Sequence, residues 1–215
     1  MRRSRLFITS ELLVAAVLQT LQALRFFSAS IFFLFVISWL SLWLRKIGWR
    51  QLGFRRPASW PHTIFIGTVV GVAYQAISIW LVMPLLYHIT NEPLNLSQFR
   101  SLHNNGSLLI LWLGVSWTIG AFGEELVYRG YLLNRVADLF DHRPDSGSIG
   151  LIVSSALFGL GHAYQGITGI IETFLFGCVM AGLYLTGQRN LWPLVIAHGV
   201  YDTVAFVLIF LGLYP

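Results

Sequence analysis

The chain has 215 residues, of which 56% are hydrophobic and only 11% are charged, with 14 lysines and arginines against nine acids. A soluble domain carries roughly 25% charged residues, so this composition argues against a soluble enzyme, a disordered chain and a nucleic-acid-binding domain. We expect one membrane domain, residues 1–215, folded as an all-α polytopic bundle of about seven transmembrane helices.

The predicted spans are apolar runs that are nearly free of charge. In chain order they cover residues 6–24, 26–44, 63–87, 107–123, 148–164, 167–186 and 191–214. The first is the weakest because Glu11, Gln19 and Gln22 interrupt it, and a cleavable signal peptide is an alternative interpretation. Residues 6–87 form leading spans, and residues 48–61, which mix aromatic side chains with arginines, predict an interfacial segment.

The basic residues predict the orientation, because they favour cytoplasmic loops. With the amino terminus inside and the carboxyl terminus outside, 11 of the 14 basic residues are cytoplasmic, while Arg25 and Arg100 are external. We therefore expect a multi-pass integral membrane protein of a prokaryotic plasma membrane. We expect it to contact the lipid bilayer and to bind no nucleic acid. The sequence does not fix its oligomeric state.

The sequence Gly-Glu-Glu-Leu-Val-Tyr-Arg at residues 123–129 places two acids where the fourth span ends. Neighbouring residues of a helix point about 100° apart, whereas Glu125 and Arg129 have the i,i+4 spacing of an ion pair. We expect Arg129 to hold Glu125 ionised and Glu124 to face elsewhere as a proton acceptor. The alternative is a helix that leaves the membrane, with both acids solvated.

Two histidine motifs follow in later spans. Phe158 and His162 lie in Phe-Gly-Leu-Gly-His, and His198 and Asp202 lie one helical turn apart in an otherwise uncharged span. An intramembrane histidine and aspartate on one face usually mark a functional site. Structural contacts between helices are the alternative for both motifs.

Distances along the helices predict the depth of this site. Glu124 is 17 residues before Asp141 and His162 is 15 residues after Gly147, so both lie nearly level, roughly 22–25 Å from the connecting turn. His198 is only seven residues past Leu191. The depths agree if the turn at 141–147 protrudes into the cytoplasm, which places the site within the bilayer nearer the cytoplasmic face.

Other polar and small residues in the spans have less specific interpretations. Glu172 suggests either a helix contact or a polar substrate channel, and Glu11 a structural or interfacial acid. Cys178 suggests a small buried residue. The glycines within the spans suggest close helix packing.

The three motifs together resemble the CPBP family of intramembrane proteases, which includes CAAX prenyl proteases of type 2 and bacteriocin-processing (Abi) proteins. The patterns that carry the resemblance are Glu-Glu-x-x-x-Arg at 124–129, Phe-x-x-x-His at 158–162 and His-x-x-x-Asp at 198–202. Their order and separation match over residues 107–213, whereas the leading spans match only generically.

The resemblance implies hydrolysis of a peptide bond in a membrane-associated polypeptide. Glu124 and His162 would activate a water, and His198 and Asp202 would complete the site; Glu125, Arg129 and Phe158 would support it. Two versions of the chemistry remain open. In one, a Zn²⁺ ion is held by His162, His198, Asp202 and Glu124; in the other, glutamate activates the water without a metal. A small proton or cation transporter and a non-catalytic immunity or scaffold protein remain alternative functions.

Overall fold

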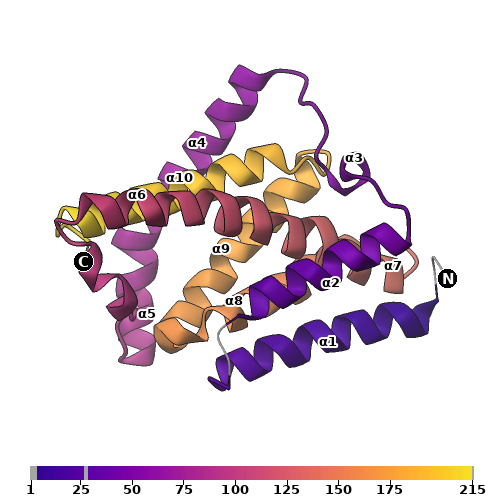
Figure 1. Cartoon of the computed structure of the whole chain (residues 1–215), viewed down its shortest axis with the longest axis horizontal. Coiled ribbons are helices and arrows are strands. Elements are labelled where there is room, and N and C mark those ends of the chain that lie inside the picture. The colour runs from indigo at the N-terminus through magenta and orange to yellow at the C-terminus, as the bar shows by residue number, and fades with distance from the viewer. Residues whose placement is uncertain (1–3, 27–28, 215) are drawn as a thin grey trace.

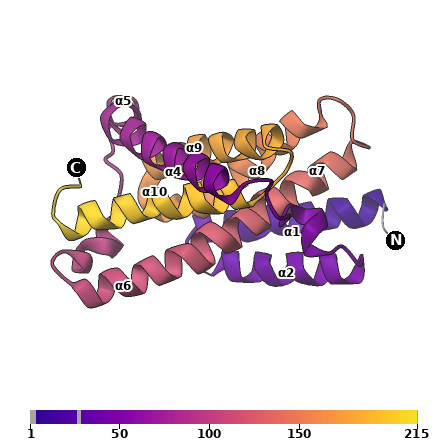
Figure 2. The same ribbon diagram turned by 90° about the horizontal axis from the view of Figure 1, so that it is seen from above.

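The computed structural model describes residues 4–26 and 29–214, and all regular elements in this part of the chain are helices. Figures 1 and 2 show them packed into one bundle. In chain order they are α1 (Arg5–Ala23), α2 (Ser30–Leu44), α3 (Trp49–Leu52), α4 (Trp60–Ile77), η1 (Ser78–Val82), α5 (Met83–Thr90), η2 (Ser97–Leu102), α6 (Gly106–Val115), η3 (Ser116–Leu133), α7 (Asn134–Leu139), α8 (Ser146–Gly161), η4 (Ala163–Gln165), α9 (Gly166–Thr186) and α10 (Trp192–Phe210).

The apolar helices of the described chain correspond to the seven predicted spans. Five helices are long and apolar enough to cross a membrane, and α2 and α8 are shorter apolar helices. Large hydrophobic side chains such as Trp80 and Ile110 are 80% and 74% exposed, which suits contact with lipid rather than water. The predicted polytopic membrane helix bundle is therefore confirmed.

The fourth span is longer than the sequence indicates. Helices α6, η3 and α7 form one continuous helix, Gly106–Leu139, whereas the predicted span ends at residue 123. Glu124 and Glu125 consequently lie in its middle, within η3, where the backbone bonds have the wider π-helical pattern. Glu125 is fully buried, so the alternative in which both acids are solvated is wrong.

The connecting segments gather at two opposite ends of the bundle. At one end, Leu191 N donates to Gly53 O over 2.9 Å and Arg189 Nη1 donates to Asn134 Oδ1 over 2.7 Å. We call this the basic end; it comprises the start of α1 and residues 45–59, 134–146 and 187–191, and lies on the right of Figure 1.

The opposite end, which we call the loop end, comprises residues 24–26, 91–105, 162–166 and 211–214. Asn95 N donates to Gln165 O over 3.0 Å, and Asn104 N donates to Phe210 O over 3.1 Å. These bonds tie the long connection after α5 to the neighbouring helix ends on the left of Figure 1.

The segment that joins η3 to α8 makes ion pairs within itself and with α1. Arg135 is buried and pairs with Asp138 at 2.5 Å, and Arg5 at the start of α1 pairs with Asp141. Helix α7 packs against α1 and α8 at the basic end. The protrusion of the turn at 141–147 into the cytoplasm, and the depth of the site that depends on it, stay predictions.

Close packing of α4 on α10 explains two of the glycines. A Cβ at Gly67 would lie 2.7 Å from Ile196, and one at Gly71 would meet the backbone of Ala197. Only glycine allows the helices to approach this closely, and the contact fixes α10, which carries His198 and Asp202.

Candidate active site

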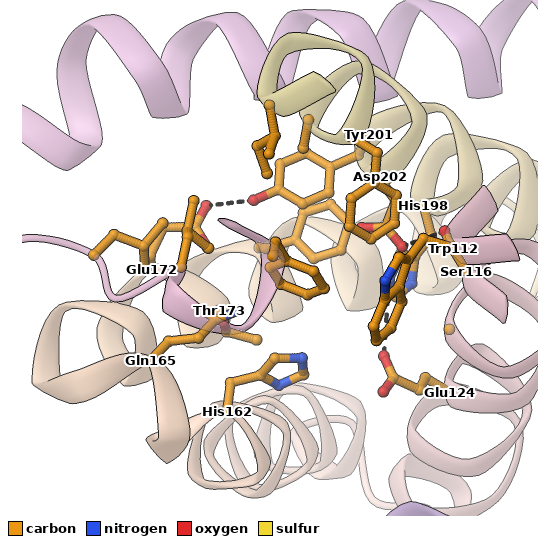
Figure 3. Close-up of a pocket in the computed structure, with 18 of the residues that line it drawn as sticks. Trp112, Ser116, Glu124, His162, Gln165, Glu172, Thr173, His198, Tyr201 and Asp202 are labelled. Atoms are coloured by element: carbon orange, nitrogen blue, oxygen red, sulfur yellow. Dashed lines mark hydrogen bonds and ion pairs between the residues drawn. The ribbon is translucent and has the colours of Figure 1, made fainter. Parts of the chain in front are cut away.

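The four residues predicted to be catalytic line one cavity of about 210 Å³. Glu124 comes from η3, His162 is the residue that ends α8, and His198 and Asp202 come from α10. Glu172 of α9 lines the same cavity. Figure 3 shows these side chains facing one another across the space between the helices.

Glu125 connects the first motif to the third. Its Oε1 accepts a bond from Arg129 Nη1 at 2.9 Å and another from His198 Nδ1 at 2.8 Å. Glu125 and Arg129 are fully buried, so the predicted ion pair forms in a dry environment. Because Nδ1 donates to this carboxylate, the other ring nitrogen of His198 is left to face the cavity.

Arg129 is held by further contacts that keep it away from the cavity. Its guanidinium lies 4.6 Å from the centre of the Phe158 ring, and Nη2 donates to Gly177 O over 3.2 Å. A cation over an aromatic face is attracted by the ring. Phe158 thus supports the site through Arg129 and also through His162, whose ring centre is 4.8 Å away.

Asp202 is held by Ser116, a residue of η3 outside the three motifs. Its Oδ2 accepts a bond from Ser116 Oγ at 2.6 Å, and lies 3.7 Å from His198 Nε2. The direct hydrogen bond to the His198 imidazole comes from Glu125 rather than from Asp202. Ser116 gave no sequence signal, because a single serine in an apolar span is common.

The outer nitrogen of His198 faces two carboxylates at intermediate distances. Nε2 is 3.8 Å from Glu124 Oε2 and 3.7 Å from Asp202 Oδ2. Polar groups separated by more than 3.5 Å are commonly bridged by a water. This corner of the cavity therefore has room for a small polar atom within reach of all three side chains.

His162 presents one defined nitrogen to the cavity. Nδ1 lies 3.0 Å from Phe158 O, and because a carbonyl oxygen only accepts, Nδ1 must be the protonated nitrogen. In the neutral ring Nε2 then carries a lone pair. Glu124 and His162 come from different helices and both face the cavity, as Figure 3 shows.

Two glutamines of α1 form hydrogen bonds with residues next to the site. Gln19 Nε2 donates to Tyr128 OH over 2.7 Å, and Gln22 Nε2 donates to Gly161 O over 2.5 Å, directly before His162. In the sequence, both glutamines stand out only as interruptions of a weak span. Their i,i+3 spacing on one helix face was the available sign of a polar contact.

Glu172 and Glu11, the other two acids of the predicted spans, have structural partners. Glu172 Oε1 accepts bonds from Ser78 Oγ at 2.8 Å and from Tyr201 OH at 3.0 Å. Glu11 pairs with Arg45 at 2.7 Å and joins α1 to α2. Glu172 therefore makes the helix contact that was one of its two interpretations, while it also lines the cavity.

The donor groups do not form a metal-ligand set in the structure. Within residues 4–26 and 29–214, no three His, Cys, Asp or Glu side chains converge as ligands would. Glu125 occupies His198 Nδ1 and Ser116 occupies Asp202 Oδ2. We derive no chemical step through a metal from this arrangement.

Comparison with known proteins identifies the segment that holds the site. Residues 106–204 match the family model described as type II CAAX prenyl endopeptidase Rce1-like. The match runs from α6 into α10 and includes all three motifs, so it confirms the resemblance to the CPBP family. No curated protein and no solved structure matches the chain.

Proposed function

We propose that this chain, whose residues 106–204 match the family model of Rce1-like type II CAAX prenyl endopeptidases, is an intramembrane endopeptidase. Its substrate would be a membrane-associated polypeptide. One observation carries the proposal: Glu124, His162 and His198 face the same cavity, and His198 is oriented by the buried Glu125.

The first step would be activation of a water between Glu124 and His162. A water has two protons, and the Glu124 carboxylate and the free Nε2 of His162 can accept one hydrogen bond each. Held in this way, the water directs a lone pair at the carbonyl carbon of the scissile bond. Its oxygen attacks this carbon as one proton passes to Glu124, which acts as the general base.

The negative charge that develops on the carbonyl oxygen needs a donor, and His198 is suited to this role. When Nε2 carries a proton, it can donate to the oxyanion while Glu125 fixes the ring through Nδ1. A fixed donor in a site that excludes bulk water stabilises such an oxyanion by several kcal/mol. The tetrahedral intermediate collapses as the C–N bond breaks and Glu124 returns its proton to the leaving amine.

Asp202 would complete the site by a different route. Because Ser116 donates to it, its carboxylate is fixed on the side of His198 that faces the cavity. There it can accept a hydrogen bond from the substrate backbone or from a water that bridges to Nε2.

The test compares peptides released from membranes of cells that express the wild-type protein or Glu124→Gln. Gln keeps the size of the side chain but cannot act as a base, so the products should disappear while the protein still inserts and folds. Glu92→Gln, in the connection after α5, is the control and should leave the products unchanged. A transporter or scaffold would show the same peptides in all three samples, and this outcome contradicts the proposal.

A further inference from the structure

Helix α1 lies outside the segment that matches the family model, yet Gln22 near its end is bonded to the end of α8. Its Nε2 donates to Gly161 O over 2.5 Å, and its Oε1 accepts from Ser30 N, at the start of α2, over 2.9 Å. The carbonyls of the last turn of a helix have no partner within that helix. Gln22 therefore supplies a donor to the turn of α8 from which His162 directly follows.

Gln19, one turn earlier on α1, forms corresponding bonds to η3 and α2. Its Nε2 donates to Tyr128 OH over 2.7 Å, and its Oε1 accepts from Ser30 Oγ over 3.3 Å. Gln19 and Tyr128 are 0% and 2% exposed, so bulk water does not compete for this contact. Tyr128 belongs to the same helix as Glu124, and both line a cavity of about 750 Å³ together with His162.

A glycine at position 161 allows the three helices to meet at one point. A Cβ on Gly161 would lie 2.8 Å from Gln19 Oε1 and 3.3 Å from Tyr128 OH. The amide of α1 and the hydroxyl of η3 thus occupy the space that a side chain of α8 would need. Because the contact is this close, a displacement of α1 here must move α8 or η3 as well.

We propose that Gln19 and Gln22 are positioning residues that set the separation of Glu124 and His162. This inference rests on the proposed function and assigns α1 and α2 a part in it. Through Gln22 these helices hold the end of α8, and through Gln19 they hold η3. A water can bond to Glu124 and His162 together only while the two groups keep a fixed distance. The glutamines therefore act through the helices and not on the substrate.

NMR signals of the histidine ring nitrogens test the positioning without a substrate. The protein is purified with isotope-labelled histidine, and His162→Gln assigns the His162 signals by their loss. Gln19→Met and Gln22→Met keep the length of each side chain but remove its amide, so each should shift or broaden the His162 signals. Thr20→Val is the matched control, because it removes a hydroxyl from an exposed position of the same helix, and it should leave these signals in place.

Kinetics distinguish positioning from substrate contact. The probe is the precursor of the peptide whose release Glu124→Gln abolishes, reconstituted with each variant in phosphatidylcholine vesicles. In Gln19→Met and in Gln22→Met, kcat should fall by about tenfold or more while KM stays unchanged, and Thr20→Val should match the wild type. Gln19→Met combined with Tyr128→Phe should be no slower than either single variant, because all three lose the same bond.

Several results overturn the proposal. A rise in KM alone would mean that a glutamine contacts the substrate, and wild-type kcat with a lowered unfolding temperature would mean a structural bond only. Unmoved His162 signals in both methionine variants overturn it too, as do additive losses of kcat in the combined variant. Tyr128→Phe loses only a hydroxyl and carries the same test if Gln19→Met does not fold.

Failure of the proposed function is distinguishable from failure of this inference. A folded wild-type protein that releases no peptide, while its His162 signals respond to the glutamine variants, would contradict only the endopeptidase. An active wild-type protein whose His162 signals and kcat are unaffected by both variants would contradict only the positioning role of the glutamines.

Discussion

At the scale of single residues, the site depends on one carboxylate oxygen that serves two partners. The pairing of Glu125 with Arg129 could be predicted from their spacing along the helix. That the same oxygen accepts a bond from His198, 73 positions further on, could not be predicted. This contact depends on how α10 packs against η3, and local periodicity contains no information on that packing.

The buried pair predicts a strongly coupled double-mutant cycle. Glu125→Gln leaves the Arg129 charge without its carboxylate, and Arg129→Met leaves Glu125 without its guanidinium, so each should cost about 3–5 kcal/mol of stability. The double variant should lose clearly less than the sum, because no uncompensated charge remains. Thermal unfolding in detergent measures this coupling, and additive losses would show that the pair contributes little.

Asp202 predicts a mild result for a conservative change. In Asp202→Asn the amide oxygen can still accept the bond from Ser116 Oγ, and Glu125 still orients His198. We expect activity within about tenfold of the wild type, whereas Asp202→Ala should lose roughly a hundredfold, in the range seen when a fixed polar group is removed from an active site.

Rates of peptide release with folded, purified variants measure this difference. A loss for Asp202→Asn as deep as for Asp202→Ala would show that the negative charge of Asp202 is required, and would contradict this prediction.

At the scale of helices, the sequence predicted where apolar segments lie better than where they end. The span expected at 107–123 continues to residue 139, because charged residues in its second half pair with one another along the same helix, Arg129 with Glu125 and Arg135 with Asp138. Helix α1 is a complete helix although polar residues interrupt its apolar run. These polar residues make buried or partly buried contacts with α2, η3 and α8. A hydropathy scale treats every charged residue in a span as if it faced lipid. Whether the residue faces lipid or a partner in the protein depends on the fold.

The contact between η3 and α10 predicts a sensitive glycine. A Cβ at Gly199 would lie 2.6 Å from the ring of Trp117, so Gly199→Ala must separate the two helices next to His198. We expect a loss of activity of at least tenfold, because small displacements of a catalytic group have large effects. Kinetics of the purified variant, together with its unfolding temperature, measure the effect.

Gly182→Ala is the matched control, since a Cβ at Gly182 of α9 meets no atom within 4 Å. It should match the wild type in both measurements, and stability should even rise slightly because alanine favours the helix. Equal activity of the two variants would mean that the Trp117 ring moves aside without disturbing His198.

At the scale of the molecule, charge patterning predicted two ends of the bundle, and the structure shows the loops gathered in that way. The depth of the site within the bilayer stays a prediction. Helix α7 packs against α1 and α8, and His162 directly follows α8 beside the loop end. Residue counts along single helices contain no information on such tilts and offsets.

The lengths of the apolar helices predict a preference for thin bilayers. Helices α2 and α8 have 15 and 16 residues, which correspond to about 22 and 24 Å against a hydrocarbon core of about 30 Å. A bilayer must thin around short helices, at a cost that rises with each ångström of mismatch. Because α8 leads directly into His162, this cost should act on the site itself.

Reconstitution in phosphatidylcholines of increasing chain length tests this preference. Unfolding temperature and rate of peptide release should both be highest in the short-chain lipid and should fall steadily toward the long-chain lipid. The wild-type protein and Gly182→Ala should follow the same trend, because a Cβ at Gly182 meets no atom within 4 Å. A maximum in the long-chain lipid would mean that α2 and α8 are not matched to the hydrocarbon core, and that the five longer helices alone set the thickness the protein requires.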